Sequence, residues 1–129
     1  MKLLLDTQIW IWIVEAPDRL PHSIRRLVSP SRAQCFLSAA SALEIAIKYR
    51  LGKLKLSADP SHLVPEWMAR TDTAPLPVLH KHALHVGALP LHHHDPFDRL
   101  LIAQAQIEDF TIVSTDRRFK SYEVKVLPA

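Results

Sequence analysis

The chain begins with the stretch Lys-Leu-Leu-Leu-Asp at residues 2–6, a short apolar run that ends on a carboxylate. A continuous apolar run of this length is typical of a strand buried on both faces of a parallel sheet. The next segment, residues 7–15, carries apolar residues at helical spacing and is closed by Pro17. A strand followed at once by a helix predicts a β–α unit with Asp6 at the carboxyl end of its strand.

The rest of the chain repeats this alternation of strand and helix. Further strands are expected at residues 33–37, 110–114 and 123–127, and two prolines restrict residues 75–78 to a short or edge strand. The intervening segments have helical spacing or helix-start signals, at residues 21–28, 60–70, 79–89, from Ser38 or Ser41 to Arg50, and from Asp95 to Glu108. This order indicates an α/β fold, one domain over residues 1–129 with a central parallel sheet flanked by helices.

The composition excludes several classes of protein. Of the 129 residues, 48% are hydrophobic and 22% charged, so the chain is neither disordered nor long enough for a multidomain assembly. Its net charge of +3 permits a nucleic-acid partner. Asp6 comes too early for a signal peptide, and no apolar stretch approaches the ~20 residues of a membrane helix. We therefore expect a cytoplasmic protein without membrane contact.

Two carboxylates follow predicted strands directly. Asp6 ends the first strand, and Asp116 follows the strand at residues 110–114. Each is also a residue type that caps a helix or forms a turn, so neither position alone decides between a structural and a functional role. Because parallel strands end at the same edge of a sheet, where ligands bind, we expect both side chains to face that edge.

Two further carboxylates stand in helical segments. Glu44 falls on a helical stripe with residues 40, 43, 47 and 51, among apolar neighbours. Burying an unpaired charge there costs several kcal/mol, which favours a functional role for Glu44. The alternative is a structural role, in which Glu44 forms an exposed ion pair with Lys48 at i+4. Asp98 lies in the first turn of its helix, where an acid also stabilises the helix dipole, while Asp95 is the expected N-cap.

Carboxylates that converge on one edge repel one another, and a divalent cation removes that conflict. Mg²⁺ and Mn²⁺ prefer oxygen ligands and keep waters for substrate phosphates. Such ions activate water and stabilise the leaving oxygen when a phosphodiester bond is hydrolysed. The acids therefore favour a metal-dependent hydrolase, with a phosphatase and a non-catalytic nucleic-acid-binding module as alternatives.

The segments that carry these acids strongly resemble the PIN-domain ribonucleases, and more narrowly the VapC-type toxins of toxin–antitoxin pairs. The matching segments are Leu-Leu-Asp-Thr-Gln-Ile-Trp at residues 4–10, Ser-Ala-Leu-Glu-Ile-Ala-Ile-Lys at 41–48, Gly-Lys-Leu at 52–54, Asp-Pro-Phe-Asp-Arg-Leu-Leu-Ile-Ala-Gln-Ala at 95–105 and Ser-Thr-Asp at 114–116. One departure is Gln8, where many relatives carry His. A phosphatase with Asp6 as nucleophile would want a second Asp at this position.

The resemblance implies an α/β/α sandwich and Mg²⁺- or Mn²⁺-dependent endoribonuclease activity. It places the catalytic and metal-binding acids at Asp6, Glu44, Asp98 and Asp116, with the hydroxyls of Thr7 and Thr115 beside them. It also implies a cognate antitoxin that binds the cleft, and a homodimer.

Basic and aromatic residues around these segments suggest contacts with RNA and with partners. Side chains expected to touch RNA are Lys48, Arg99, Arg117 and His93. Three consecutive histidines at residues 92–94 do not converge readily on one ion and have no cysteine partner, so a zinc site is the weaker alternative. Trp10 and Trp12 cannot share one helix face, so we expect one of them near the surface, where together with Trp67 it meets an antitoxin.

Overall fold

A five-stranded parallel sheet forms the centre of the computed structural model, which describes residues 1–29 and 33–128. The strand order is β3-β2-β1-β4-β5, and every neighbouring pair is parallel. The strands are β1 (Lys2–Leu5), β2 (Gln34–Ser38), β3 (Thr73–Leu76), β4 (Thr111–Val113) and β5 (Val126–Leu127). The predicted α/β class is confirmed, and the proline-containing segment is indeed an edge strand.

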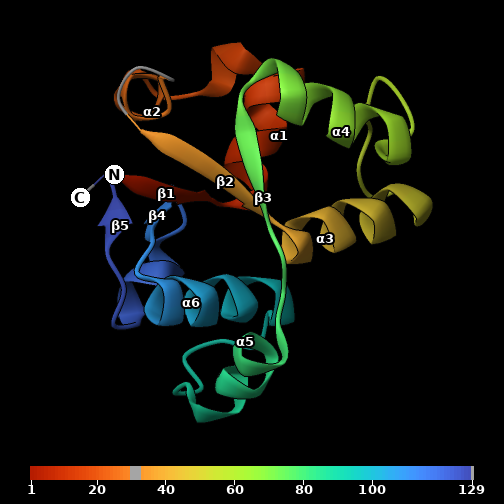
Figure 1. Ribbon diagram of the computed structural model, residues 1–129. Coiled ribbons are helices and arrows are strands. Elements are labelled where there is room, and N and C mark those ends of the chain that lie inside the picture. Colours follow the sequence, from red (N-terminus) through yellow and green to blue (C-terminus); the bar gives the residue numbers. More distant parts are fainter. Residues whose placement is uncertain (30–32, 129) are drawn as a thin grey trace.

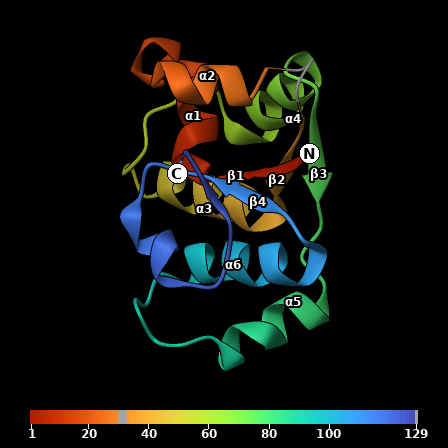
Figure 2. The same ribbon diagram turned by 90° about the vertical axis from the view of Figure 1, so that its left-hand side faces the viewer.

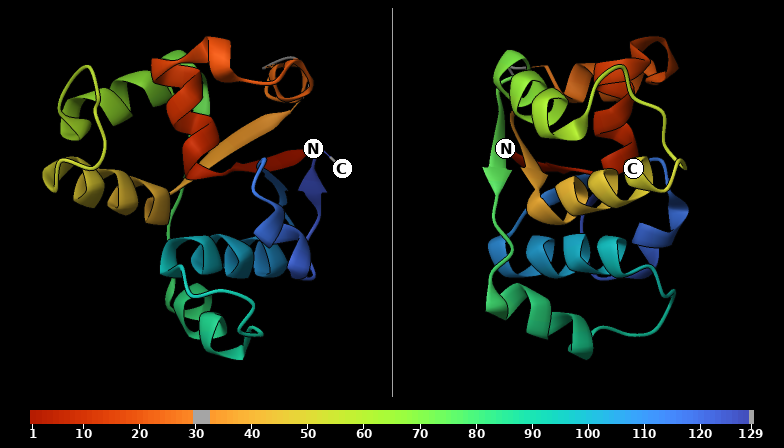
Figure 3. Two further views of the ribbon diagram at one scale, coloured as in Figure 1. Left: turned by 180° about the vertical axis from the view of Figure 1, so that it is seen from behind. Right: turned by 90° about the vertical axis from the view of Figure 1, so that its right-hand side faces the viewer.

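Helices cover both faces of this sheet (Figures 1 and 2). One face carries α1 (Thr7–Glu15), α2 (His22–Leu27) and α4 (Pro60–Arg70), and the other carries α6 (Pro96–Glu108), against whose outer side α5 (His80–His85) packs. Helix α3 (Ala39–Arg50) extends outward from the end of β2 and contacts α1, α4 and α6 (Figure 3). Short 3₁₀ turns span Pro17–Arg19, Val86–Ala88 and Arg117–Ser121. Within the described ranges, no helix is long and apolar enough to cross a membrane.

Strand β1 is buried on both faces, as its continuous apolar sequence predicts. Leu3 and Leu5 belong to the core beneath α1 and α4, while Leu4 belongs to the core beneath α6. Successive side chains of a strand point to opposite faces, so three leucines in a row supply both cores. The strand also pairs with β2 on one side and β4 on the other, which fixes the position of Asp6 at its end.

Helix α3 turns a different face to the core from the one expected. Leu43, Ile47 and Leu51 are 53%, 41% and 61% exposed, so the prediction that they share a buried stripe with Glu44 was wrong. Two members of the expected stripe, Ala40 and Glu44, are buried as predicted, and Ser41 and Ile45 complete the buried face. The Ser38 side chain caps the helix by accepting a hydrogen bond from the Ala40 amide. Glu44 is nevertheless buried, and the exposed apolar row is left on the outer side of α3.

Candidate active site

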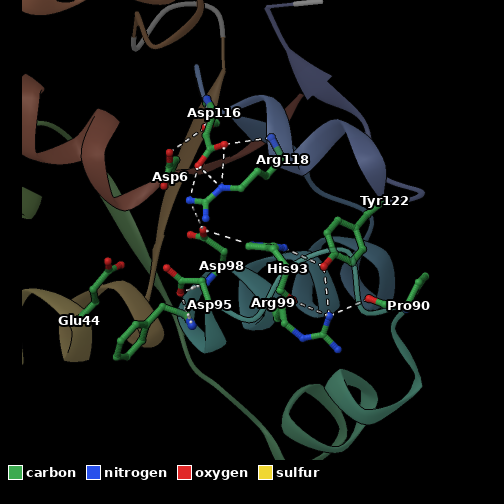
Figure 4. A network of polar contacts seen from close by, with 12 residues as sticks. Asp6, Glu44, Pro90, His93, Asp95, Asp98, Arg99, Asp116, Arg118 and Tyr122 are labelled. Atoms are coloured by element: carbon green, nitrogen blue, oxygen red, sulfur yellow. Dashed lines mark hydrogen bonds and ion pairs between the residues drawn. The ribbon is translucent and has the colours of Figure 1, made fainter.

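The four predicted acids line one cleft of about 370 Å³ at the carboxyl edge of the sheet (Figure 4). Asp6 comes from the end of β1, Glu44 from α3, Asp98 from α6 and Asp116 from the turn after β4. The remaining charged side chains of the lining are Asp95, Lys48, Lys53 and Arg118. Residues up to 110 positions apart in sequence thus meet at the edge where parallel strands end, as predicted.

Asp6 is buried and held by the neighbouring strand. Its Oδ2 accepts a hydrogen bond of 2.7 Å from Ser114 Oγ, and its backbone amide donates to Val113 O at 3.0 Å. It occupies the N-cap position of α1 without a side-chain capping bond, so its carboxylate is free to face the cleft. Burial, with smaller contributions from Glu44 and Asp116, raises the pKa of Asp6 to about 6.

Glu44 is 7% exposed and only half paired. Its Oε2 accepts a hydrogen bond from Lys48 Nζ, one helical turn away, so the predicted alternative of an ion pair is present. Its Oε1 is buried and has no hydrogen-bond partner among the described residues. A buried carboxylate oxygen without a partner is costly, which makes Oε1 a place where a cation or a water would be stabilised.

Asp95 and Asp98 divide two tasks at the start of α6. Asp95 Oδ1 accepts hydrogen bonds from the amides of Phe97 and Asp98, at 2.9 and 3.1 Å, and so caps the helix as expected. The side chain of Asp98 is thereby released from capping and lies in the cleft, 9% exposed. Burial raises the pKa of Asp98 to about 7, with further contributions from the negative charges of Asp95, Asp6 and Glu44.

Asp116 combines a turn-forming role with a place in the cleft. Its Oδ1 accepts from the Arg118 amide at 2.9 Å, which caps the 3₁₀ turn, and its Oδ2 accepts from Arg118 Nη2 at 2.7 Å. These hydrogen bonds from Arg118 hold the pKa of Asp116 below its usual range. Ser114 Oγ accepts from the Asp116 amide at 2.9 Å while donating to Asp6, so one serine links two of the acids.

The two threonines predicted beside the acids have different surroundings. Thr7 is buried and lines the cleft, and its Oγ1 donates to Ser41 Oγ at 2.8 Å, which ties α1 to α3. Thr115 is exposed and lines the cleft. Ser114 was not singled out in the sequence, although it begins the Ser-Thr-Asp segment.

The expected phosphate contact at Arg99 is wrong. Arg99 is 6% exposed, and its guanidinium donates to the carbonyl oxygens of Val86, Leu89, Pro90 and His93 and to the hydroxyl of Tyr122. These bonds fasten the segment before α6 to the helix and engage both terminal nitrogens of the buried guanidinium.

The other residues expected to touch RNA lie at different depths. Lys48 lines the cleft, whereas Arg117 is exposed and outside its lining. The next residue, Arg118, is the one that enters the cleft. His93 is largely buried, with Nδ1 2.8 Å from the Tyr122 hydroxyl and Nε2 3.5 Å from Asp98 Oδ2. Burial, followed by the charge of Arg118, lowers the pKa of His93.

The acids share a cleft but do not form a ready-made metal cage. Among residues 1–29 and 33–128, no three Asp, Glu, His or Cys side chains are arranged to hold one ion. The donors still suit a divalent cation, since all are carboxylates, Glu44 Oε1 lacks a partner, and two of the pKa values are raised. The guanidinium of Arg118 is the group that lies between Asp98 and Asp116.

Comparisons with known proteins agree with this geometry. The PIN domain family model matches residues 3–125. Ribonuclease VapC16 of Mycobacterium tuberculosis is 49% identical over 64 residues, which is 50% of this chain and 45% of that protein. The chain matches less than half of this relative's length.

Two solved structures show the same fold over almost the entire chain. VapBC2 from Rickettsia felis, bound to a promoter DNA fragment, has a TM-score of 0.71 at 18% identity and covers 98% of this chain and 97% of its own. DNA-bound VapBC from Salmonella typhimurium has a TM-score of 0.65 at 19% identity, covering 98% and 96%.

Proposed function

The chain belongs to the PIN-domain family, and on that premise we propose that it is a metal-dependent endoribonuclease that acts as the toxin of a toxin–antitoxin pair. The observation that carries the proposal is the meeting of Asp6, Glu44, Asp98 and Asp116 in one cleft at the carboxyl edge of the sheet. The similarity to a ribonuclease of the VapC type supports RNA as the substrate.

In this proposal the carboxylate oxygens of the four acids would hold Mg²⁺ or Mn²⁺, which when bound would polarise a water and place positive charge against the scissile phosphate. Ser114 keeps Asp6 oriented through its 2.7 Å hydrogen bond. Glu44 Oε1, which lacks a partner, is available to accept a proton from the attacking water.

Basic side chains around the cleft would hold the RNA backbone. Lys48 and Lys53 line the cleft, and Arg117 lies on the exposed turn beside it. His93 Nε2 lies 3.5 Å from Asp98 Oδ2, so His93 would affect RNA cleavage indirectly, by positioning the Asp98 carboxylate. Contacts of lysine and arginine with phosphates weaken as salt rises, so cleavage is expected to slow at high ionic strength.

The proposed activity is tested with the purified chain, a single-stranded RNA and Mn²⁺ or Mg²⁺. Asp6→Asn and Asp98→Asn each keep the size of the side chain but remove a charge, and each should lower the cleavage rate about 100-fold or more. Chelation of the metal should abolish cleavage by the wild type.

The matched control is Asp109→Asn, which changes an exposed aspartate at the far end of α6. This variant should cleave as the wild type does. Wild-type rates in both Asp6→Asn and Asp98→Asn would show that this cleft does not perform the reaction.

We further propose that a cognate antitoxin covers α1 and α4. Trp10 is in the core, 1% exposed, whereas Ile11, Trp12, Trp67 and Met68 are only partly buried on these helices. Ile11 also lines the cleft, so an apolar segment of a partner packed there would lie next to the acids. Both solved relatives are complexes named VapBC.

We also propose that the protein is a cytoplasmic homodimer. The exposed row of Leu43, Ile47 and Leu51 on α3 supports a contact between two copies, because apolar side chains gathered on one helix face commonly mark an interface.

A further inference from the structure

Arg118 makes an ion pair with two acids of the cleft at once. Its Nη2 lies 2.7 Å from Asp116 Oδ2 and 3.5 Å from Asp98 Oδ2, and its Nε lies 3.2 and 3.1 Å from the two oxygens of Asp116. Figure 4 shows the guanidinium between the two carboxylates, with Asp6 nearby. One side chain thus supplies positive charge at a point shared by acids from α6 and from the turn after β4.

The net charge of the cleft favours the binding of a cation. Five carboxylates and three cationic side chains line it, which leaves two negative charges when all are ionised. Lys48 is paired with Glu44, whereas Arg118 is paired with Asp98 and Asp116. Without Arg118 the cleft would hold one more uncompensated negative charge. That charge would lie beside Asp98, whose side chain is only 9% exposed to solvent.

The side chain of Arg118 can leave this position without disturbing the fold. It is 55% exposed, and its position in the 3₁₀ turn is fixed by the backbone, whose amide donates to Asp116 Oδ1. Ion pairs with so exposed a partner contribute little net stability, about 0–1 kcal/mol. Rotation of the side chain into solvent would free oxygens of both acids.

We propose that Arg118 competes with the divalent cation for the cleft: its guanidinium must leave Asp98 and Asp116 before these acids can hold an ion. The inference rests on the proposed function, since it assigns the metal to this cleft. Metal and guanidinium need the same carboxylate oxygens, so each weakens the binding of the other by the same factor. Arg118 therefore sets the metal concentration at which the site fills.

The inference is tested by measuring Mn²⁺ binding calorimetrically on the full chain, without RNA. Arg118→Gln removes the competing charge and should lower the dissociation constant for Mn²⁺ by roughly fivefold or more, within the range typical of coupled sites. Arg118→Lys keeps a charge without the guanidinium fork, and should give an intermediate value. Lys120→Gln changes an exposed basic residue of the same turn that lies outside the cleft lining, and should bind Mn²⁺ as the wild type does.

A melting experiment in chelator and in Mn²⁺ provides a second measurement. Arg118→Gln should melt lower than the wild type in chelator, because the acids lose their counter-charge, and should gain more from added Mn²⁺. Equal or weaker Mn²⁺ binding by Arg118→Gln would overturn the inference while leaving the metal site in place. If the wild type bound no Mn²⁺, or Asp98→Asn bound it equally well, the metal site of the proposed function would fail as well.

Discussion

Asp98 and Asp6 are the carboxylates that the surrounding protein affects most. Both are buried beside other acids, and their pKa values are raised to about 7 and about 6 from an ordinary value of 3.8. In the folded protein these groups therefore keep protons that the unfolded chain releases near pH 4. The metal-free fold therefore carries repulsion between carboxylates at neutral pH, which a bound cation would relieve.

The stability of the metal-free protein should fall as pH rises. Because the folded state binds more protons than the unfolded chain between about pH 4 and pH 7, the favourable contribution is complete below pH 4 and is lost as pH rises through about 6 and 7. In chelator, the melting temperature should decrease by several degrees from pH 5 to pH 8. Asp98→Asn should flatten this slope and Asp109→Asn should not. A wild-type melting temperature that rises steadily through this range would contradict the raised pKa values.

Single side chains also show where the sequence was insufficient. The four acids were predictable because each lies in a recognisable segment: Asp6 and Asp116 follow strands, Asp98 lies in the first turn of a helix, and Glu44 stands among apolar neighbours within a helix. Arg99, Arg117 and Arg118 were not distinguishable, since all three are basic residues close to an acid. Only the fold shows that Arg99 is enclosed by carbonyl oxygens, Arg117 is outside the cleft lining, and Arg118 is inside it.

Helix α3 serves two surfaces at once. Its buried row brings Glu44 to the cleft and Ile45 to the core, while its outer row leaves Leu43, Ile47 and Leu51 exposed. Both rows contain apolar residues, so periodicity alone did not tell which one the core would cover. The capping serine was also ambiguous: Ser38 caps the helix, while Ser41 lies inside it and receives the hydrogen bond from Thr7.

The outer row of α3 should hold two copies of the chain together. Ile47→Glu places a charge in the middle of this row and should convert the dimer to a monomer in sedimentation velocity, because a charge buried in an apolar contact is costly. The circular dichroism spectrum should not change, since Ile47 is already 41% exposed. Leu84→Glu changes an exposed leucine on α5 and is the control. Dissociation by Leu84→Glu but not by Ile47→Glu would place the contact elsewhere.

The overall architecture follows from a few segments of the sequence. The all-leucine strand β1 lies at the centre of the sheet with a core on each face, and its neighbours β2 and β4 were also predicted. The ends were less predictable: the last strand spans only Val126–Leu127, and the helix expected at residues 79–89 ends at His85 and continues as a 3₁₀ turn. In such segments short-range preferences are weak, and packing decides where an element ends.

Expression of the chain alone in a bacterial host should stop growth, because the cleft is open to RNA in the absence of a partner. Coexpression of the proposed cognate antitoxin should restore growth, and Asp98→Asn should be harmless without any antitoxin. Colony counts after induction provide the measurement. Equal growth arrest by the wild type and Asp98→Asn would separate the toxicity from this cleft.

Strand β3 affects the tendency of the protein to aggregate when many copies are synthesised together. It is the outermost strand beside β2, and Pro75 stands within it, opposite Leu37 of β2. Proline has no backbone N–H, so an extended segment from another molecule that approaches this edge finds its hydrogen-bond ladder interrupted. The prolines that limit this strand in sequence thus also oppose edge-to-edge aggregation of newly made chains.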